Sequence, residues 1–173
     1  MSFDIAFKLL RGSGIAAVLA SAAFLASCQV RPLYSENSGV AGKLASVGFS
    51  EATSRVEQEV RNRLIFIASR GAGEPANPDY KVELSVRSNV ISTLLVARSD
   101  ESLAGRATVS VDYTVKSAKD GHIIKAGNRY ATALIDFPAQ EFAKQRAIRD
   151  AENRAARQAA EFVGADIAAA LGR

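Results

Sequence analysis

Cysteine, histidine and tryptophan are nearly missing from this chain of 173 residues. It holds one cysteine, one histidine and no tryptophan, and aromatic residues make up only 7% of it. A single cysteine rules out a disulfide within the chain and a metal site built from several thiolates. The only histidine, His122, directly follows the turn-forming pair Asp120-Gly121, which predicts an exposed loop position. The sequence therefore offers little material for nucleophilic or metal-assisted catalysis.

Other missing features disfavour further classes of protein. The aromatic residues do not alternate with the basic ones, so a stacking platform for nucleic acid is not indicated. No glycine-rich phosphate-binding motif occurs, and no acidic residue stands at metal-ligand spacing from the histidine. We therefore expect no cofactor, no metal and no nucleic-acid partner. The net charge of +4 is compatible with an anionic partner without requiring one.

The longest uncharged apolar stretch lies near the N-terminus. Lys8 and Arg11 precede a run from residue 12 to residue 25 that is rich in Ala, Leu, Ile, Val and Phe. As a helix this run would span about 21 Å, well short of the roughly 30 Å hydrocarbon core of a bilayer. That length is typical of the apolar part of an export signal. The segment that ends it, Leu25-Ala26-Ser27-Cys28, resembles the lipobox of bacterial lipoproteins.

The lipobox resemblance implies that Cys28 is lipidated. In that pattern the thiol receives a diacylglyceryl group, the chain is cut before the cysteine, and the new amino group is acylated. Several acyl chains anchor a protein stably, at about 0.8 kcal/mol per buried methylene. Gln29 stands where aspartate marks retention at the inner membrane in the enterobacterial pattern, so we expect a lipid-anchored protein on the periplasmic side of the outer membrane. A plain secretory signal and an uncleaved anchor are the alternatives.

The rest of the chain predicts one domain behind a short tether. We expect a signal peptide at 1–27, a lipidated N-terminus and tether at 28–43, and a single domain at 44–173. A short strand is expected over 44–49. Ser54 and Glu57 have the spacing of a capping box. A helix should follow, because apolar residues then recur at three- and four-residue intervals, at Val56, Val60, Leu64 and Ile67.

Three strands and a second helix are expected after this first helix. Apolar and polar residues alternate from Tyr80 to Val86 and from Ala107 to Val115, and a third strand is expected from Ile123 to Ile135. The segment 90–105 predicts a long hairpin that extends beyond the packed core. A long helix should begin at Pro138 with Asp136 as its cap, and Gly164 should loosen or kink it. Its inward face is predicted to contain Ile148, Ala151, Ala155, Ala159, Phe162 and Ile167.

These elements predict an α+β fold in the order strand-helix-strand-strand-strand-helix. Two helices packed on one face of a mostly antiparallel four-stranded sheet would bury all the apolar stripes. The basic residues of the long helix alternate with acids, which is typical of a solvated face. Because nothing here assembles a catalytic site, we expect a binding protein and not an enzyme. The residues predicted to be buried are Val82, Leu84, Val109, Val111, Tyr113, Phe162 and Ile167.

The mature N-terminus is similar to that of a known family. Cys28-Gln29-Val30-Arg31-Pro32-Leu33-Tyr34 resembles the Cys-Gly-Phe-Arg-Pro-Leu-Tyr opening of alphaproteobacterial lipopolysaccharide-assembly lipoproteins, the LptE family. In this chain Gln29-Val30 replaces the usual Gly-Phe. The resemblance extends over essentially the whole mature chain, through segments at Glu59–Leu64, Tyr80–Val86, Gly127–Arg129, Asp150–Ala155 and Ile167–Leu171.

The resemblance implies a protein partner and a lipid ligand. Members of the family sit as a plug inside the outer-membrane β-barrel LptD, help it fold, and help it place lipopolysaccharide in the outer leaflet. A rigid domain with polar surfaces suits this role, because the lumen of a large barrel is polar. Contacts to the phosphates of lipopolysaccharide would require Arg or Lys. Arg98 and Arg106, near the hairpin end, are the candidates, although basic residues there also serve solubility or blunt a sheet edge.

Two other functions remain open at this point. One is an auxiliary lipoprotein of an ABC-type lipid transport system, which could also be a small anchored α/β domain. The other is an anchored hydrolase of the cell envelope, which would need a nucleophile and a base close together. Association with an inner-membrane permease instead of an outer-membrane barrel would select the first alternative.

Overall fold

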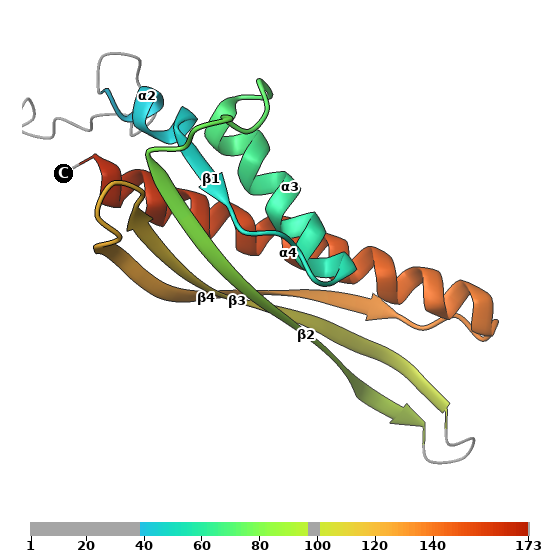
Figure 1. Cartoon of the computed structure of the whole chain (residues 1–173). Helices are drawn as coiled ribbons and strands as arrows, with labels where there is room; N and C mark the ends of the chain where they lie inside the picture. The colour runs from blue at the N-terminus through green and yellow to red at the C-terminus, as the bar shows by residue number, and fades with distance from the viewer. Residues whose placement is uncertain (1–38, 97–100, 173) are drawn as a thin grey trace, which may run out of the picture. The chain divides into compact units, whose positions relative to one another are not determined.

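Helices α3 and α4 cover one face of a four-stranded sheet (Figure 1). The computed structural model describes residues 39–96 and 101–172. In chain order its elements are α2 (Val40–Ala45), β1 (Val47–Phe49), α3 (Arg55–Ser69), β2 (Tyr80–Val96), β3 (Glu101–Ser117), β4 (Ile123–Asp136) and α4 (Glu141–Leu171). The predicted α+β class and the predicted pairing of a sheet with helices on one face are confirmed. The signal peptide, Cys28 and Arg98 lie outside the described residues.

The strands follow one another in space as they do in the sequence, in the order β1-β2-β3-β4. Strand β1 runs parallel to β2, and the other neighbours are antiparallel. The β2–β3 hairpin is paired from Tyr80 and Ser117 out to Val96 and Glu101, whereas β4 pairs with β3 only as far as Ala104. The hairpin therefore extends past β4, as the sequence predicts for 90–105.

The core lies between the sheet and the helices, with β3 at its centre. Inward-facing residues of β3 recur at a period of two and are at most 3% exposed: Ala107, Val109, Val111, Tyr113 and Val115. Small side chains on α4, such as Ala155 and Ala159, let this helix approach the sheet closely. Full burial of each valine contributes roughly 1.5–3 kcal/mol. The alternation that defines β3 in the sequence thus supplies the floor of the core.

The capping box predicted for α3 forms with a small change. The Ser54 hydroxyl accepts a hydrogen bond from the Glu57 backbone N–H at 3.2 Å. The Glu57 carboxylate, only 5% exposed, accepts from the backbone N–H and the hydroxyl of Thr53 at 2.8 and 2.7 Å. This buried charge is therefore satisfied by donors one residue before the expected position.

Three ion pairs hold α3 parallel to α4, and the helix that supplies the cation alternates from one pair to the next. Arg55 pairs with Glu152, Glu59 with Arg157 at 2.6 Å, and Arg63 with Glu161. Half-exposed pairs of this kind contribute little to stability individually. Their alternation specifies the register, because a shift by one turn would bring like charges together. Arg157 is thus a bridge to α3 and not only part of a solvated face.

Gly164 brings the two helices close together instead of kinking α4. The helix is continuous from Glu141 to Leu171, and Gly164 is buried. A Cβ at this position would lie 3.3 Å from Cγ2 of Ile67 and 3.8 Å from Cδ2 of Leu64. The expected kink at Gly164 is therefore wrong, and the missing side chain makes room for α3.

Several predicted boundaries differ from the structure. Leu44 and Ala45 end helix α2, so the strand expected over 44–49 begins only at Val47. Asp136 is the last residue of β4, paired with Ala104, and does not cap a helix. Helix α4 begins at Glu141, after Phe137 has reached the core, and its N-cap residue Gln140 makes no side-chain cap bond.

Two residues of the predicted core are less buried than expected. Phe162 is 43% exposed, and Leu84 is only partly buried at the edge of the core. Around Phe162 the buried residues of α4 are Ala159, Ala160, Val163 and Gly164, so the buried arc has turned toward α3 and leaves Phe162 at its edge. A single stripe drawn from the sequence does not follow this turn.

Candidate functional site

The sheet face opposite the helices presents side chains in rows across β2, β3 and β4; we call it the open face. Because successive side chains of a strand point to opposite faces, the open face takes the residues that alternate with the core. From the β1 end toward the hairpin tip, its rows include Glu83–Thr114–Ala126, Ser85–Asp112–Asn128, Arg87–Ser110–Tyr130, Asn89–Thr108–Thr132 and Ile91–Arg106–Leu134, and the pair Ala104–Asp136 follows beyond them. The open face is therefore mainly polar.

Charges in the middle of the open face neutralise one another. Asp112 forms an ion pair with Arg87 and accepts a hydrogen bond from the Asn128 amide at 2.7 Å. The same amide donates to the Ser110 hydroxyl at 3.0 Å. Nearer the β1 end, the Lys116 ammonium donates to both oxygens of Glu83 at 2.7 Å. This part of the open face is thus rich in hydrogen-bonding groups but carries little net charge.

The row of Arg106, near the hairpin tip, has a different character. Arg106 lies between Ile91 on β2 and Leu134 on β4, which are 37% and 75% exposed. Among the described residues, no acidic side chain forms an ion pair with Arg106. An unpaired guanidinium between exposed aliphatic side chains suits a ligand that carries both an anionic group and a hydrocarbon part.

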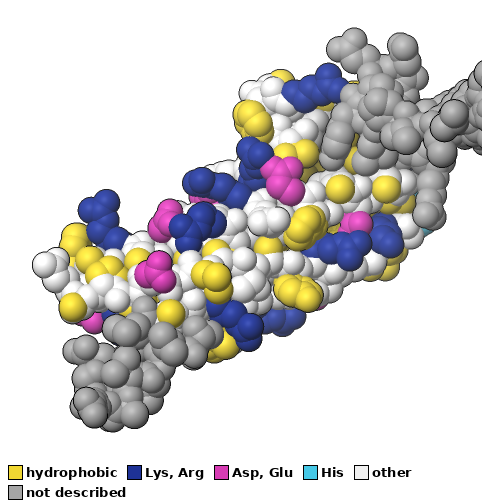
Figure 2. Space-filling view, turned by 180° about the vertical axis from the view of Figure 1, so that it is seen from behind, with side chains coloured by type: hydrophobic (Ala, Val, Ile, Leu, Met, Phe, Trp, Pro, Cys, Tyr) yellow, Lys and Arg dark blue, Asp and Glu magenta, His cyan; other side chains and the backbone are white. Residues whose placement is uncertain are grey.

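The structure describes only one of the two arginines expected to bind an anionic ligand. Arg106 is exposed on the open face, as the hairpin position predicts. Arg98 lies outside the described residues, so the structure does not place the two side chains relative to each other. Figure 2, a view from behind, shows further Lys and Arg side chains spread over the folded unit. Charge alone therefore does not single out one site.

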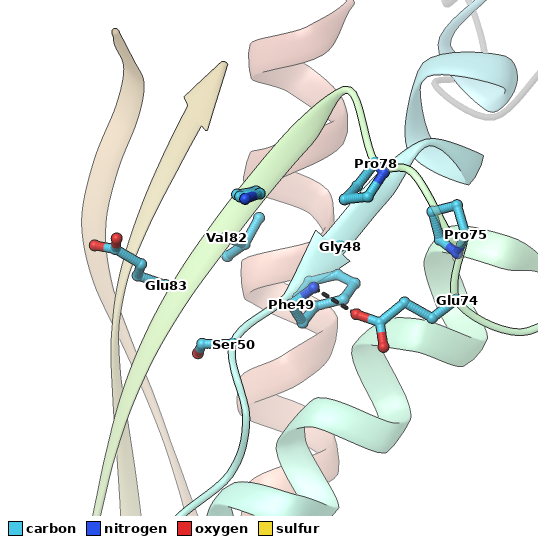
Figure 3. A pocket seen from close by; sticks show the side chains of 9 residues that line it. Gly48, Phe49, Ser50, Glu74, Pro75, Pro78, Val82 and Glu83 are labelled. Carbon is cyan, nitrogen blue, oxygen red and sulfur yellow. Dashed lines mark hydrogen bonds between the residues drawn. The ribbon is translucent and has the colours of Figure 1, made fainter. Parts of the chain in front are cut away.

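A pocket of about 220 Å³ lies beside the edge strand β1 (Figure 3). Gly48 lies under Pro78, whose Cγ would be 2.9 Å from a Cβ at this position. The Glu74 carboxylate accepts a hydrogen bond from the Phe49 backbone N–H at 2.6 Å and pairs with Arg61. The Glu74 carboxylate therefore closes the edge of β1. Of the other charged residues that line the pocket, Glu83 is paired with Lys116, and Lys81 is exposed.

A polar cluster fastens the C-terminal half of α4 to the sheet. Asp166 accepts a hydrogen bond from the Tyr113 hydroxyl at 2.6 Å and two from the Arg129 guanidinium at 2.7 and 2.8 Å. The bonds from Arg129, together with that from Tyr113, hold the pKa of Asp166 below its usual value. Burial and the bond to Asp166 raise the pKa of the Tyr113 hydroxyl. All three groups are paired with one another, so the cluster is structural.

Replacing Asp166 with asparagine should make stability less dependent on pH. At pH 7 the Asp166→Asn variant should lose about 1 kcal/mol of unfolding free energy, because the Arg129 guanidinium would then donate to a neutral amide instead of a carboxylate. A carboxylate with a lowered pKa in the folded state stabilises above its unfolded pKa of about 3.9, and this contribution disappears as the pH falls through the folded pKa. The difference between parent and variant should therefore shrink below about pH 4.

Urea unfolding at a series of pH values from 7 to 3 measures this difference. Asp79→Asn is a suitable control, because Asp79 is exposed and its carboxylate has no ion pair among the described residues. A constant difference between parent and Asp166→Asn at all pH values would show that the carboxylate charge does not matter.

The described residues do not assemble a catalytic or metal centre. His122 is exposed beside Asp120, with Nδ1 3.4 Å from the carboxylate. No group of three or more His, Cys, Asp or Glu side chains in residues 39–96 and 101–172 could hold a metal ion. Within the same residues, no helix is both long and apolar enough to cross a membrane.

Sequence reasoning missed the exposed large side chains of the open face. Ile91 and Leu134 flank Arg106, and Tyr130, two rows away, is 66% exposed. The period-two pattern could have assigned Tyr130 and Leu134 to the same face as Thr132. It could not have shown that Leu134 lies beside Arg106, because that depends on the register between β3 and β4.

Comparisons with known proteins agree with this fold. The model of the LptE family, described as lipopolysaccharide-assembly, matches residues 43–165. Comparison with the curated proteins found no match. Among solved structures, a protein of Caulobacter crescentus described as a lipoprotein is 25% identical and superposes with a TM-score of 0.63. The alignment covers 77% of this chain and 96% of that protein.

Other lipoprotein structures are more distantly similar. The rare lipoprotein B of Shewanella oneidensis is 18% identical, with a TM-score of 0.49, over 71% of this chain and 92% of that chain. A minor lipoprotein of Acinetobacter baumannii is 12% identical, also with a TM-score of 0.49, over 71% of this chain and 88% of that chain. Of these three structures, the Caulobacter protein alone exceeds a TM-score of 0.5.

Proposed function

The chain belongs to the LptE family of lipopolysaccharide-assembly lipoproteins, and from this premise we propose that it plugs an LptD-type β-barrel of the outer membrane. In this role it helps the barrel to assemble and assists the insertion of lipopolysaccharide into the outer leaflet. The match over residues 43–165 carries the proposal, because it spans nearly all of the folded elements.

The polar character of the open face supports a plug. The lumen of a large outer-membrane barrel is polar, so a domain enclosed by it needs surfaces that exchange hydrogen bonds with polar walls or water. The central rows of the open face provide such a surface with the polar side chains of Asp112, Asn128 and Ser110, and the Arg87–Asp112 ion pair leaves these rows without net charge. A catalytic role finds no comparable support in the described residues.

Attachment through Cys28 completes the proposal. Residues 1–27 would be removed as a signal peptide, 28–43 would carry the acyl chains and the tether, and 44–173 would form the plug domain. The anchor would hold the domain on the periplasmic side of the outer membrane, beside the barrel that it fills. The mass of the N-terminal peptide of the purified protein reports this modification directly.

Arg98 and Arg106 are proposed to contact the phosphates of lipopolysaccharide. The support for Arg106 is its exposure without an ion-pair partner among the described residues. Its aliphatic neighbours Ile91 and Leu134 would suit the acyl chains of the same ligand. Arg98 enters the proposal through its place in the sequence, between the two strands of the hairpin.

Co-purification tests the proposed partner. A soluble form that starts at Gln29 and is exported by another signal should recover an LptD-type barrel from detergent-solubilised outer membranes in stoichiometric amount. The interface should survive loss of the lipid, because an enclosed domain contacts the barrel over far more area than an anchor does. Recovery of an inner-membrane permease without a barrel would overturn the proposal in favour of an auxiliary protein of an ABC-type lipid transporter.

Charge reversal tests the proposed ligand contacts separately from the barrel. Arg98→Asp combined with Arg106→Asp should weaken lipopolysaccharide binding about tenfold or more and leave barrel recovery unchanged. Lys119→Asp is the matched control, since Lys119 is exposed in the turn between β3 and β4 at the other end of the sheet. Equal lipopolysaccharide binding by the double variant and the control would remove both arginines from the site.

A further inference from the structure

The chemistry of the open face changes in a fixed order along its strands. Near the hairpin tip, Arg106 lies between the aliphatic side chains of Ile91 and Leu134, and only the pair Ala104–Asp136 follows beyond it where β4 is paired. The next row toward the β1 end contains only hydroxyl and amide side chains, and the row after it contains an aromatic ring. From the Arg106 row toward the β1 end, the order is therefore apolar and cationic, then neutral and hydrogen-bonding, then a row in which the Tyr130 ring accompanies Ser110 and the ion-paired Arg87.

The hydroxyl and amide row retains groups that are available to a ligand. It consists of Asn89, Thr108 and Thr132. The two threonine hydroxyls lie 3.3 Å apart, a long contact that leaves hydrogen-bonding capacity on both. The Asn89 amide is exposed and has no hydrogen-bond partner among the described residues.

Tyr130 adds an exposed ring to a region without net charge. Its side chain is 66% exposed, and its neighbour across the strands is Ser110. The charged residues nearby, Arg87 and Asp112, are paired with each other. An exposed aromatic ring among hydroxyl and amide groups is suited to the flat faces and hydroxyl groups of sugar rings, since tyrosine combines an apolar face with a polar edge. It is less suited to a strongly charged ligand.

We propose that the open face binds lipopolysaccharide in one direction, with its lipid end toward the hairpin tip and its sugars over Tyr130. Acyl chains would contact Ile91 and Leu134, a phosphate would bind Arg106, and the following sugars would contact Asn89 and Tyr130. Arg106 and Tyr130 are two rows apart, which corresponds to about 14 Å along the strands. The order of groups on the face thus matches the order of acyl chains, phosphates and sugars in the ligand. This inference rests on the proposed function and adds a saccharide site to it.

Core oligosaccharide freed of lipid by mild acid hydrolysis is the probe for the saccharide site. Binding to the mature lipoprotein in detergent should be lowered about three- to tenfold by Tyr130→Ala and much less by Tyr130→Phe, which keeps the ring. Arg106→Gln should leave oligosaccharide binding unchanged while it weakens binding of lipid A. Phe142→Ala is the matched control, because Phe142 is a 76% exposed aromatic residue on α4, away from the open face.

The direction of binding is tested by proximity. With intact lipopolysaccharide, nuclear Overhauser contacts should join acyl-chain protons to Leu134 and sugar protons to Tyr130. The reversed set of contacts, or an oligosaccharide affinity unchanged by Tyr130→Ala, would overturn the inference. Loss of barrel co-purification by Tyr130→Ala with oligosaccharide binding intact would show that the barrel wall covers Tyr130, which also overturns it. The proposed plug function would survive each of these results, because it depends on recovery of the barrel by the parent chain.

Discussion

Replacing Val111 with aspartate should cost the protein most of its stability. Val111 is fully buried near the middle of β3, the central strand of the core. A carboxylate there would lose its hydration without gaining an adequate partner, which costs several kcal/mol. Its cross-strand neighbour Arg129 is already bound by Asp166 at 2.7 and 2.8 Å. Because domains of this size are stable by about 5–15 kcal/mol, this loss removes a large share of the unfolding free energy and should lower the melting temperature by about ten degrees or more.

A variant of the same strand provides the control for this prediction. Thr108→Asp introduces the same carboxylate in place of a side chain of similar size. Thr108, however, lies on the open face, one row from Arg106. Its unfolding free energy should stay within about 1 kcal/mol of the parent. Urea unfolding followed by circular dichroism measures both variants. If Val111→Asp melted within a few degrees of the parent, the assignment of β3 side chains to the core would be wrong.

The strands were largely predictable because their pattern is local. In β3 every second residue is apolar and the intervening ones are polar, so Val109 and Val111 could be assigned to the core and Thr108 to the opposite face. Strand β4 was harder to interpret. It carries Ala131 and Ile135 on the buried face and Tyr130 and Leu134 on the open face, so apolar character alone does not separate its two sides.

The parts that were missed depend on contacts between distant segments. Gly164 is indistinguishable from a helix-loosening glycine until Ile67 is seen to pack against it. Phe162 fits an inward stripe until α3 is seen to cover a second face of α4. The same limit applies to the candidate site. Arg106 could be named from its place near the hairpin, but its neighbours Ile91 and Leu134 follow only from the register of the strands.

Adding a single methyl group at Gly105 should destabilise the end of the fold that carries the row Ile91–Arg106–Leu134. A Cβ at this position would lie 2.5 Å from Cζ of Phe137 and 2.8 Å from the backbone oxygen of Ile91. Side-chain atoms could move aside, but the carbonyl belongs to a paired strand and cannot shift without breaking the register. We expect Gly105→Ala to lower the unfolding free energy by about 3 kcal/mol, at the upper end of the usual cost of overpacking.

Hydrogen exchange should locate the damage caused by Gly105→Ala. Phe137 belongs to a small core cluster with Ala107, Ile135 and Ala151, separate from the main core. Amides around this cluster should lose protection more than those around Val82 and Val115, which lie in the main core. Gly42→Ala is the control, because a Cβ there meets no atom within 4 Å.

The consequence for function follows from the position of Gly105 in the hairpin. It immediately precedes Arg106 in β3, so a displaced Gly105 backbone moves the guanidinium relative to Ile91 and Leu134. Gly105→Ala should therefore weaken lipid A binding while the oligosaccharide still binds beside Tyr130, four residues further along the sheet face. Unchanged lipid A affinity in a variant whose amides around the Phe137 cluster exchange faster would show that the Arg106 row need not be rigid to bind its ligand.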